Sequence, residues 1–240
     1  MSSLVRSNRL SLTPDVYVIE SDFTETLNTT NLYVATLTDS GTATVVDAAK
    51  GILPIVPSDG TVADNDEAYV QTKIESWLFA NNKPFRCGAY IQFTEGNTDD
   101  ANIAFGMANA PVADTLVDNG GGIRTTGSSV AIYKVDGGTV WKCETTMNSV
   151  QTVSTSTKSS SSSSYQLLEI EAIDHSETEI EVCFLVDNQY LVDSTSNLRI
   201  VHRVTIASAT EMAMFAGIKN GAATTVEQLN VDYWYATCRR

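Results

Sequence analysis

The chain has 240 residues, of which 42% are hydrophobic, and a formal net charge of −14 at pH 7. A chain of this length and apolar content can bury a substantial core as one large domain or one domain with an appendage. An acidic body repels phosphate backbones, which argues against general binding to nucleic acid. No stretch approaches the roughly 18 apolar residues of a membrane-spanning segment, and the first residues lack the apolar run of a signal peptide. We therefore expect a protein that is made in the cytoplasm and does not contact a membrane.

The four cysteines are far apart in the sequence. Cys87, Cys143, Cys183 and Cys238 form no Cys-x-x-Cys pair, and the chain has only two histidines. A zinc site is therefore not expected. Each cysteine lies in a strand-like segment, which favours four reduced, packed thiols. A disulfide remains an alternative if the protein matures outside a cell.

Basic residues gather at the two ends of this acidic chain. Residues 1–14 contain Arg6 and Arg9 and no acidic residue, and the chain ends in Arg239 and Arg240. This distribution fits ordinary surface composition or, alternatively, ends that dock onto an acidic partner. A short β-prone run without an obvious partner nearby follows the basic segment and consists of Val16, Tyr17, Val18 and Ile19.

Two short strands are expected next, at residues 32–37 and 42–46. The sequence Thr-Asp-Ser-Gly at residues 38–41 separates them and is a hairpin signal. Pro54 and Pro57 then mark a boundary or a sheet edge.

The two prolines lead us to divide the chain into two parts. Residues 1–55 are expected to form an extended arm with a small β segment, and residues 56–240 the main domain. Residues 63–79 fit a short helix or a strand. Their acidic cluster, Asp64, Asp66 and Glu67, lacks the spacing of a tight calcium loop.

The main domain shows the period-two alternation of β-strands. In the last strand, this alternation predicts Tyr233 and Tyr235 on one face and Trp234 on the other. The low-complexity run at residues 152–164 fits a mobile loop or a polar edge strand. Strands are expected at residues 85–93, 102–108, 130–135, 139–144, 200–206, 213–218 and 226–237. Many short strands with turns between them predict an all-β antiparallel sandwich or barrel.

The clearest hairpin spans residues 165–192. Its first strand alternates Leu168, Ile170 and Ala172 with Glu169 and Glu171. Its second strand alternates apolar residues with acidic ones in the same way, and a polar loop at residues 174–177 joins the two. One face of this hairpin should therefore be buried and the other exposed.

The order of these features resembles the concanavalin A-like jelly roll of lectins, laminin-G-type modules and related glucanases. The phrases that carry the resemblance are FRCGAYIQFTE, NIAFGMA, the hairpin YQLLEIEAIDHSETEIEVCFLVDNQYLV, AMFAGIKN and LNVDYWYATCR. The resemblance covers roughly residues 84–240. It implies an all-β antiparallel jelly-roll sandwich, preceded here by the extended arm. Asn188 stands where such modules usually carry glycine.

A narrower resemblance is to structural proteins of tailed bacteriophages. It rests on the phrases IQFTEGNTDDANIAFGMANA and VAIYKVDGGTVWKCET, which surround a glycine-rich loop. It implies a virion protein on the capsid surface that contacts the major capsid protein and its own copies, as a trimer or dimer. The arm and tail residues that would make these contacts are Arg6, Arg9, Val16, Tyr17, Val18, Ile19, Arg239 and Arg240.

An acidic motif on the hairpin resembles a glucanase active site. Glu169 and Glu171 would project to one face about 7 Å apart, which suits paired carboxylates. Relative to the glucanase pattern Glu-Ile-Asp-x-x-Glu, however, Glu171 replaces aspartate and Asp174 replaces glutamate. A shortened acid misplaces the carboxyl group. We therefore expect two solvated glutamates and no catalytic residue.

Carbohydrate binding is the third option that the chemistry leaves open. Exposed aromatic rings and nearby Asn or Asp side chains could hold a sugar, and Trp141, Trp234 and Tyr190 are the candidate rings. The Asp99–Asp100 pair could hold calcium, although a solvated turn is the preferred interpretation, and no other cofactor is expected.

These observations predict a non-enzymatic viral structural protein, a decoration or cement protein of a phage head. The first alternative is a lectin-like module of a virion or fibre that binds a host-surface glycan. The second alternative is a glucanase-like glycoside hydrolase.

Overall fold

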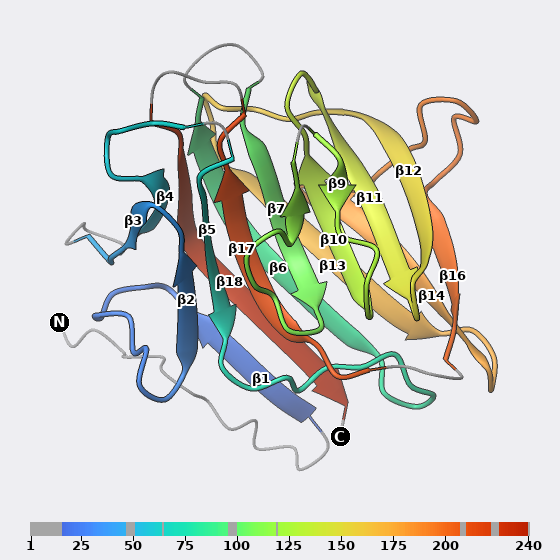
Figure 1. Cartoon of the computed structure of the whole chain (residues 1–240). Helices are drawn as coiled ribbons and strands as arrows, with labels where there is room; N and C mark the ends of the chain where they lie inside the picture. Colours follow the sequence, from blue (N-terminus) through green and yellow to red (C-terminus); the bar gives the residue numbers. More distant parts are fainter. Residues whose placement is uncertain are drawn as a thin grey trace, which may run out of the picture.

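The computed structural model describes residues 16–46, 51–63, 65–95, 100–118, 120–206, 210–221 and 226–239. Two large antiparallel sheets pack face to face, and a two-stranded ribbon lies on one of them (Figure 1). These ranges contain strands and connecting segments but no helix. Consequently, they contain no helix that could cross a membrane.

The first sheet has nine strands. β1 (Val16–Ser21) pairs with β18, and β16 (Val201–Thr205) pairs with β14. The other strands follow in the order β15 (Gln189–Tyr190), β14 (Glu179–Val186), β13 (Gln166–Asp174), β6 (Phe85–Thr94), β18 (Gln228–Arg239), β4 (Leu53–Ser58) and β3 (Ser40–Ala43).

The second sheet has seven strands, and the ribbon lies outside it. The strands follow in the order β12 (Val150–Ser159), β11 (Val140–Met147), β10 (Ser129–Lys134), β7 (Asn102–Ala108), β17 (Ala213–Lys219), β5 (Glu67–Thr72) and β2 (Tyr33–Leu37). The ribbon consists of β8 (Leu116–Val117) and β9 (Gly122–Ile123).

The alternation of apolar and polar residues along the strands builds the core between the two sheets. Leu168, Ile170 and Ala172 of β13 are buried in it, together with the alternate apolar residues of β14. The predicted hairpin is confirmed, with an unbroken register from Leu168–Val186 to Asp174–Ile180. Its second turn places Asp187 at φ 54° and Asn188 at φ 61°. Two left-handed residues are what a tight type I′ turn requires, and aspartate and asparagine tolerate this conformation without being glycine.

The described part of the predicted arm belongs to both sheets. β1 and β3 lie in the nine-stranded sheet, whereas β2 pairs with β5 in the seven-stranded one. The prediction of a hairpin around residues 38–41 is therefore wrong, because these residues lead from one sheet to the other. Asp39 and Ser40 have positive φ, and Thr38 binds the backbone of Glu67. The proposed boundary at residue 55 falls inside β4.

Two undecided segments prove to be strands. Within residues 63–79, β5 takes the strand alternative, and Trp77 makes an isolated bridge to Met212. The serine-rich run contributes most of β12, a largely exposed strand at the edge of the seven-stranded sheet. Serine and threonine suit such an edge because their hydroxyl groups remain hydrated while the backbone pairs on one side.

Candidate functional site

The outer face of the nine-stranded sheet carries a cluster of charged and aromatic side chains. Because Leu168, Ile170 and Ala172 of β13 point into the core, Glu169 and Glu171 point away from it. The antiparallel register places Glu171 beside Arg86 of β6 and Glu169 beside the neighbouring Gly88. Two strands far apart in sequence thus bring an arginine and two carboxylates together.

Arg86 bridges the two glutamates. Its Nη2 lies 2.7 Å from Glu169 Oε1, and its Nη1 lies 3.0 Å from Glu171 Oε1. The Tyr235 hydroxyl of β18 also donates to Glu169 Oε1. Glu169 is only 2% exposed, so the expectation of two solvated glutamates is wrong for this residue. A buried carboxylate needs such partners, because an uncompensated charge is costly away from water.

Gly88 makes this arrangement sterically feasible. A Cβ atom at this position would lie 2.6 Å from Tyr235 Cε1 and 3.1 Å from Glu169 Cγ. The absence of a side chain lets the Tyr235 ring lie across β6 and reach the carboxylate. Burial and this hydrogen bond to Glu169 raise the pKa of Tyr235, so its hydroxyl stays protonated as the donor.

Tyr190 extends the cluster onto β15. Its hydroxyl donates to Glu171 Oε2 at 3.1 Å, and this hydrogen bond raises the tyrosine pKa. The Arg199 guanidinium lies 3.8 Å from the centre of the Tyr190 ring, a cation–π contact. Arg199 Nη2 also lies 3.7 Å from Glu181 Oε1. Tyr190 is 43% exposed, so a ligand can reach its ring and its hydroxyl.

Two further pairs of tyrosines lie on or beside strands of this sheet. Tyr90 and Tyr165 stack with ring centres 5.0 Å apart, and Tyr90 is exposed. Tyr233 and Tyr235 stack at 5.9 Å. In the register, Tyr90 lies opposite Tyr233. The face therefore combines accessible aromatic rings with paired carboxylate and guanidinium groups.

Asp174 does not join the two glutamates. It lies opposite Ile180, a core residue, so the unbroken register places it on the other face of the sheet. Its Oδ1 accepts a hydrogen bond from the Asn82 backbone N–H. Ile173 occupies the position on the outer face that follows Glu169 and Glu171. The three acids of the glucanase-like motif are therefore not brought together.

Both predicted tryptophan platforms are buried and cannot stack on a sugar. Trp141 and Trp234 are 0% exposed. Trp141 donates from Nε1 to Gln166 Oε1, and Trp234 packs against Phe23 at 5.5 Å. For Trp234 the reason is a break in register between Val231 and Tyr233, which adds one residue to β18 and reverses its alternation. Of the predicted rings, only Tyr190 is accessible.

The predicted partner-binding residues within the described chain lie on β1 and at the end of β18. Val16, Tyr17, Val18 and Ile19 form β1, which pairs with β18 of the same chain rather than standing without a partner. Tyr17 packs on Trp77 at 6.0 Å, and Arg239 is exposed at the end of β18. Arg6, Arg9 and Arg240 lie outside the described residues. Their role in binding a partner stays a prediction.

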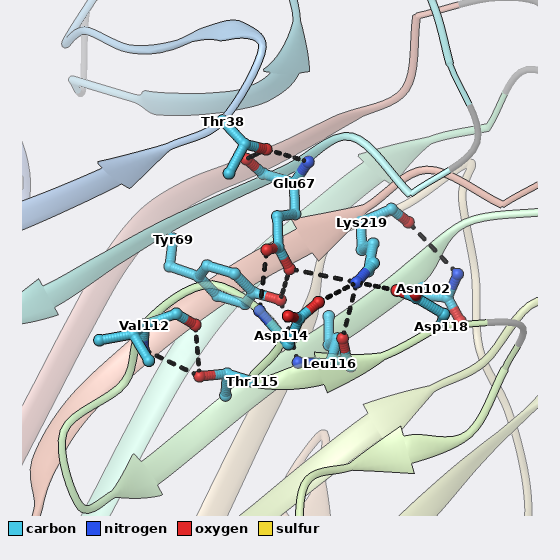
Figure 2. A network of polar contacts seen from close by, with 10 residues as sticks. All are labelled: Thr38, Glu67, Tyr69, Asn102, Val112, Asp114, Thr115, Leu116, Asp118 and Lys219. Atoms are coloured by element: carbon cyan, nitrogen blue, oxygen red, sulfur yellow. Dashed lines mark hydrogen bonds and ion pairs between the residues drawn. The ribbon is translucent and has the colours of Figure 1, made fainter.

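A second polar cluster lies on the outer face of the seven-stranded sheet. There, the buried Lys219 of β17 contacts Glu67 of β5 and two aspartates near the ribbon, Asp114 and Asp118 (Figure 2). Tyr69 donates from its hydroxyl to Glu67 Oε2 at 2.7 Å. In this cluster Lys219 and Glu67 are buried, and the two aspartates are exposed.

The described residues contain no group of three or more His, Cys, Asp or Glu side chains arranged to hold a metal ion. Of the acidic residues considered for calcium, Asp64 and Asp99 lie outside the described ranges. Asp66 accepts a hydrogen bond from the Ala63 N–H, and Glu67 pairs with Lys219.

Sequence reasoning missed Arg86, Gly88, Tyr235 and Arg199. Arg86 and Gly88 occupy the positions of β6 that alternate with its core residues, so their outward direction was readable in the sequence. Their neighbours were not, because the β6–β13 and β6–β18 registers join segments separated by many residues.

Comparisons with known proteins agree with the architecture. No known family profile and no curated protein sequence matches the chain. Among solved structures, an endo-1,3-β-glucanase from Streptomyces sioyaensis is similar with a TM-score of 0.61 and 14% identity, over 96% of this chain and 99% of that one. The carbohydrate recognition domain of Emp47p has a TM-score of 0.57 and 14% identity, over 94% and 98%.

Peanut lectin is similar with a TM-score of 0.52 and 15% identity, over 93% of this chain and 97% of that one. Identities this low show the fold alone. Together with the two antiparallel sheets, these likenesses show that the chain has the concanavalin A-like β-sandwich of lectins and glucanases.

Proposed function

We propose that this chain is a non-catalytic carbohydrate-binding module and that its ligand lies on the outer face of the nine-stranded sheet. The observation that carries the proposal is the accessible Tyr190 ring beside Glu171 and Arg86. A sugar presents an apolar C–H face that packs on an aromatic ring, and hydroxyl groups that bond to carboxylates and guanidinium groups. The face offers both kinds of contact.

The charge of this face favours a neutral glycan. Glu169, Glu171 and Glu181 lie among the arginines of this face, and the whole chain carries a net charge of −14. An anionic polysaccharide would be repelled by this field, whereas hydroxyl groups would not. The glucanase named above acts on a β-1,3-glucan, which makes a β-1,3-linked glucose oligosaccharide a suitable first probe.

A binding role is preferred over hydrolysis because of the positions of the acids. Glycoside hydrolysis needs one carboxyl group that gives up a proton and a second that acts as a nucleophile or base. Here Arg86 bridges both glutamates, and Asp174 lies on the opposite face. The two glutamates can accept hydrogen bonds from a sugar, but the third acid of the glucanase-like motif is not beside them.

The experiment is a glycan array followed by calorimetry with the best ligand. Tyr190→Ala is expected to weaken binding about tenfold, because it removes one aromatic contact and the donor to Glu171. Val153→Ala is the matched control, since Val153 is 46% exposed, about as much as Tyr190, but lies on β12 of the other sheet. Unchanged affinity in Tyr190→Ala would refute the proposed location.

The same protein should leave β-glucan intact. Release of reducing ends that disappears in Glu169→Gln would instead support the glucanase alternative. Absence of any binding across neutral and acidic glycans would count against the carbohydrate proposal as a whole.

The capsid-decoration role expected from the phage resemblance stays a second prediction. The feature that favours an assembly role is β1, which pairs with β18 on one side and with no described strand on the other. An unpaired strand edge can accept a strand from a neighbouring molecule. Finding the chain in purified virions would support this role, and its absence from them would refute it.

A further inference from the structure

A second apolar cluster lies outside the main core, between the seven-stranded sheet and the β8–β9 ribbon. Leu116 of β8 and Ile123 of β9 are almost completely buried there. On the sheet, small residues of β7 and β10 separate larger aromatic ones and leave a trough between them. The cluster consists of Tyr69, Ala104, Ala108, Leu116, Ile123, Ala131, Tyr133, Val135 and Phe215. The ribbon thus fills a trough whose walls are aromatic.

The segment that carries the ribbon, residues 111–118 and 120–127, is called the lid below. Left-handed residues mark both of its ends, Ala110 at φ 43° before it and Gly127 at φ 78° after it. Asp114 within it has φ 60°. Alanine adopts this conformation only when its surroundings impose it, whereas aspartate tolerates it more readily. The closed position of the lid therefore depends on its contacts with the sheet.

Lys219 makes the central contact between sheet and lid (Figure 2). Its Nζ lies 3.1 Å from Asp114 Oδ1, 3.1 Å from the Leu116 carbonyl oxygen and 3.4 Å from Glu67 Oε2, and it also pairs with Asp118. The Lys219 side chain is 1% exposed, whereas those of Asp114 and Asp118 are 76% and 49% exposed. The ion pairs of Lys219 with Asp114 and Asp118 are called the latch below. Their sheet side is buried, and their lid side is exposed to solvent.

Two more hydrogen bonds attach the lid to the same group of residues. The Asp114 N–H donates to Glu67 Oε1 at 2.8 Å, and the Leu116 N–H donates to the Tyr69 hydroxyl at 2.9 Å. At the opposite side of the ribbon, Gln151 Nε2 donates to the Ile123 carbonyl oxygen at 3.2 Å. Most of the polar contacts that hold the lid therefore converge on one cation and one glutamate.

The ammonium group of Lys219 balances the carboxylates that meet between lid and sheet. Three carboxylates, from Glu67, Asp114 and Asp118, surround a single ammonium group. Burial opposes the charge of Lys219, but hydrogen bonds to Asp118 and Asp114 outweigh it and raise the lysine pKa. Without the ammonium group, the carboxylates of lid and sheet would repel one another.

We propose that the lid is an autoinhibitory cover whose Leu116 and Ile123 occupy an aromatic trough, and that the pairs of Lys219 with Asp114 and Asp118 keep it closed. When the latch is weakened, the lid lifts and the trough accepts a ligand with apolar faces and hydroxyl groups, that is, a glycan. The walls supply the rings of Tyr69 and Tyr133, and the buried carboxylates of Glu67 and Glu144 supply acceptors. Glu144 Oε2 has no hydrogen-bond partner among the described residues, so one acceptor is unused in the closed state.

The test measures lid opening and ligand binding separately. Trypsin cleavage after Arg124 reports opening, because in the closed state Arg124 donates hydrogen bonds to the Asn109 and Ala110 carbonyl oxygens. Asp118→Asn, which removes one half-exposed partner of Lys219, is expected to speed this cleavage about fivefold. Hydrogen exchange of the lid amides should accelerate in parallel, with the core strands unchanged. Asp187→Asn is the matched control, since Asp187 forms an exposed ion pair with Lys158 far from the lid.

Binding is measured in a Tyr190→Ala background, which removes the ring proposed above as the open binding site. With a β-1,3-linked glucose hexamer as the probe, Asp118→Asn should bind at least about fivefold more tightly than its parent. Lys219→Met should do so more strongly. If Lys219→Met does not fold, Asp118→Asn alone decides the matter.

Equal cleavage and exchange in Asp118→Asn and its parent would overturn the latch. Faster opening without any gain in binding would overturn the autoinhibitory role. Neither result bears on Tyr190, whose contribution is measured with the lid closed, so the two proposals fail independently.

Discussion

Glu144 is a carboxylic acid in a place where its charge is poorly solvated. It lies on β11, buried among Ser129, Thr146 and the ring of Tyr133, which faces it from β10. The Thr146 hydroxyl donates to its Oε1 at 2.9 Å, but no cation contacts it among the described residues. Burial raises the pKa of this glutamate from 4.5 to about 7. The raised pKa makes stability depend on pH.

Replacing Glu144 with glutamine should remove this dependence. The unfolded chain loses the proton near pH 4.5 and the folded chain near pH 7, so stability falls as pH rises between these values, by about 3 kcal/mol in total. Glu144→Gln keeps the acceptor for Thr146 without a charge. It should therefore be more stable than the parent at pH 8 by about 1–3 kcal/mol, and no more stable at pH 4.5.

Urea unfolding at pH 4.5 and pH 8 measures the difference. Glu171→Gln serves as the control, since Glu171 is partly exposed and paired with Arg86, and should show no gain at pH 8. If the unfolding free energy of Glu144→Gln depends on pH as that of the parent does, the raised pKa of Glu144 is contradicted.

For single residues, the face of the sheet to which a side chain points was predictable only where apolar and polar residues alternate without a break. The outward direction of Glu169 and Glu171 follows from Leu168 and Ile170, and the structure bears it out. The burial of Glu169 was not readable, because it depends on Tyr235 and Arg86 from other strands. Trp234 was assigned to the wrong side for a different reason. A single added residue in β18 reverses the pattern, and composition does not reveal it.

At the scale of elements, one histidine joins the edges of the two sheets. His202 of β16 is buried, with Nδ1 3.0 Å from Thr145 Oγ1 of β11 and Nε2 3.0 Å from Ser154 Oγ of β12. Its ring also packs edge-on against Phe184 at 5.0 Å. Burial lowers its pKa from 6.5 to about 4, so the native ring stays neutral in mild acid.

The contact of β16 with β11 and β12 should therefore weaken in acid. Between pH 6.5 and pH 4 the unfolded chain binds a proton that native His202 does not, so stability falls as pH falls, by about 3 kcal/mol in total. In His202→Gln, the slope of unfolding free energy against pH should be shallower by up to about 1.4 kcal/mol per pH unit. The measurement is chemical unfolding at several values between pH 4 and pH 6.5.

His175 provides the matched control, because it lies in the exposed loop between β13 and β14. A parental slope in His202→Gln would show that the buried histidine does not couple the two sheets to pH.

Hairpins between strands that are adjacent in the sequence were predictable, but the sheet to which each strand belongs was not. The β13–β14 and β10–β11 hairpins follow from alternation and turn residues alone, since their partners are adjacent in sequence. The turn residues at 38–41 gave the same signal, yet β2 and β3 lie in different sheets. What decides between a hairpin and a crossing is the partner strand, β5 for one and β4 for the other, and this partner is long-range.

At the scale of the whole molecule, the described part of the arm is joined to the far end of the chain. β1 pairs with β18 over six residue pairs, from Val16–Arg239 to Ser21–Trp234. Phe23 and Tyr33 then pack on Trp234, with ring centres 5.5 and 5.6 Å away. These contacts close the sandwich by connecting segments far apart in the sequence, so residues 16–46 should not unfold as an independent unit.

This closure predicts a single unfolding transition. All three tryptophans are buried, so their fluorescence and the far-ultraviolet circular dichroism should change at the same urea concentration. Phe23→Ala should destabilise the entire chain by about 3–5 kcal/mol, because it opens a cavity beside Trp234 at the joint of β1 and β18. Leu32→Ala, an exposed position in the same segment, should change stability by less than about 0.5 kcal/mol. An early, separate transition in Phe23→Ala, with the main transition unmoved, would show instead that the arm is its own unit.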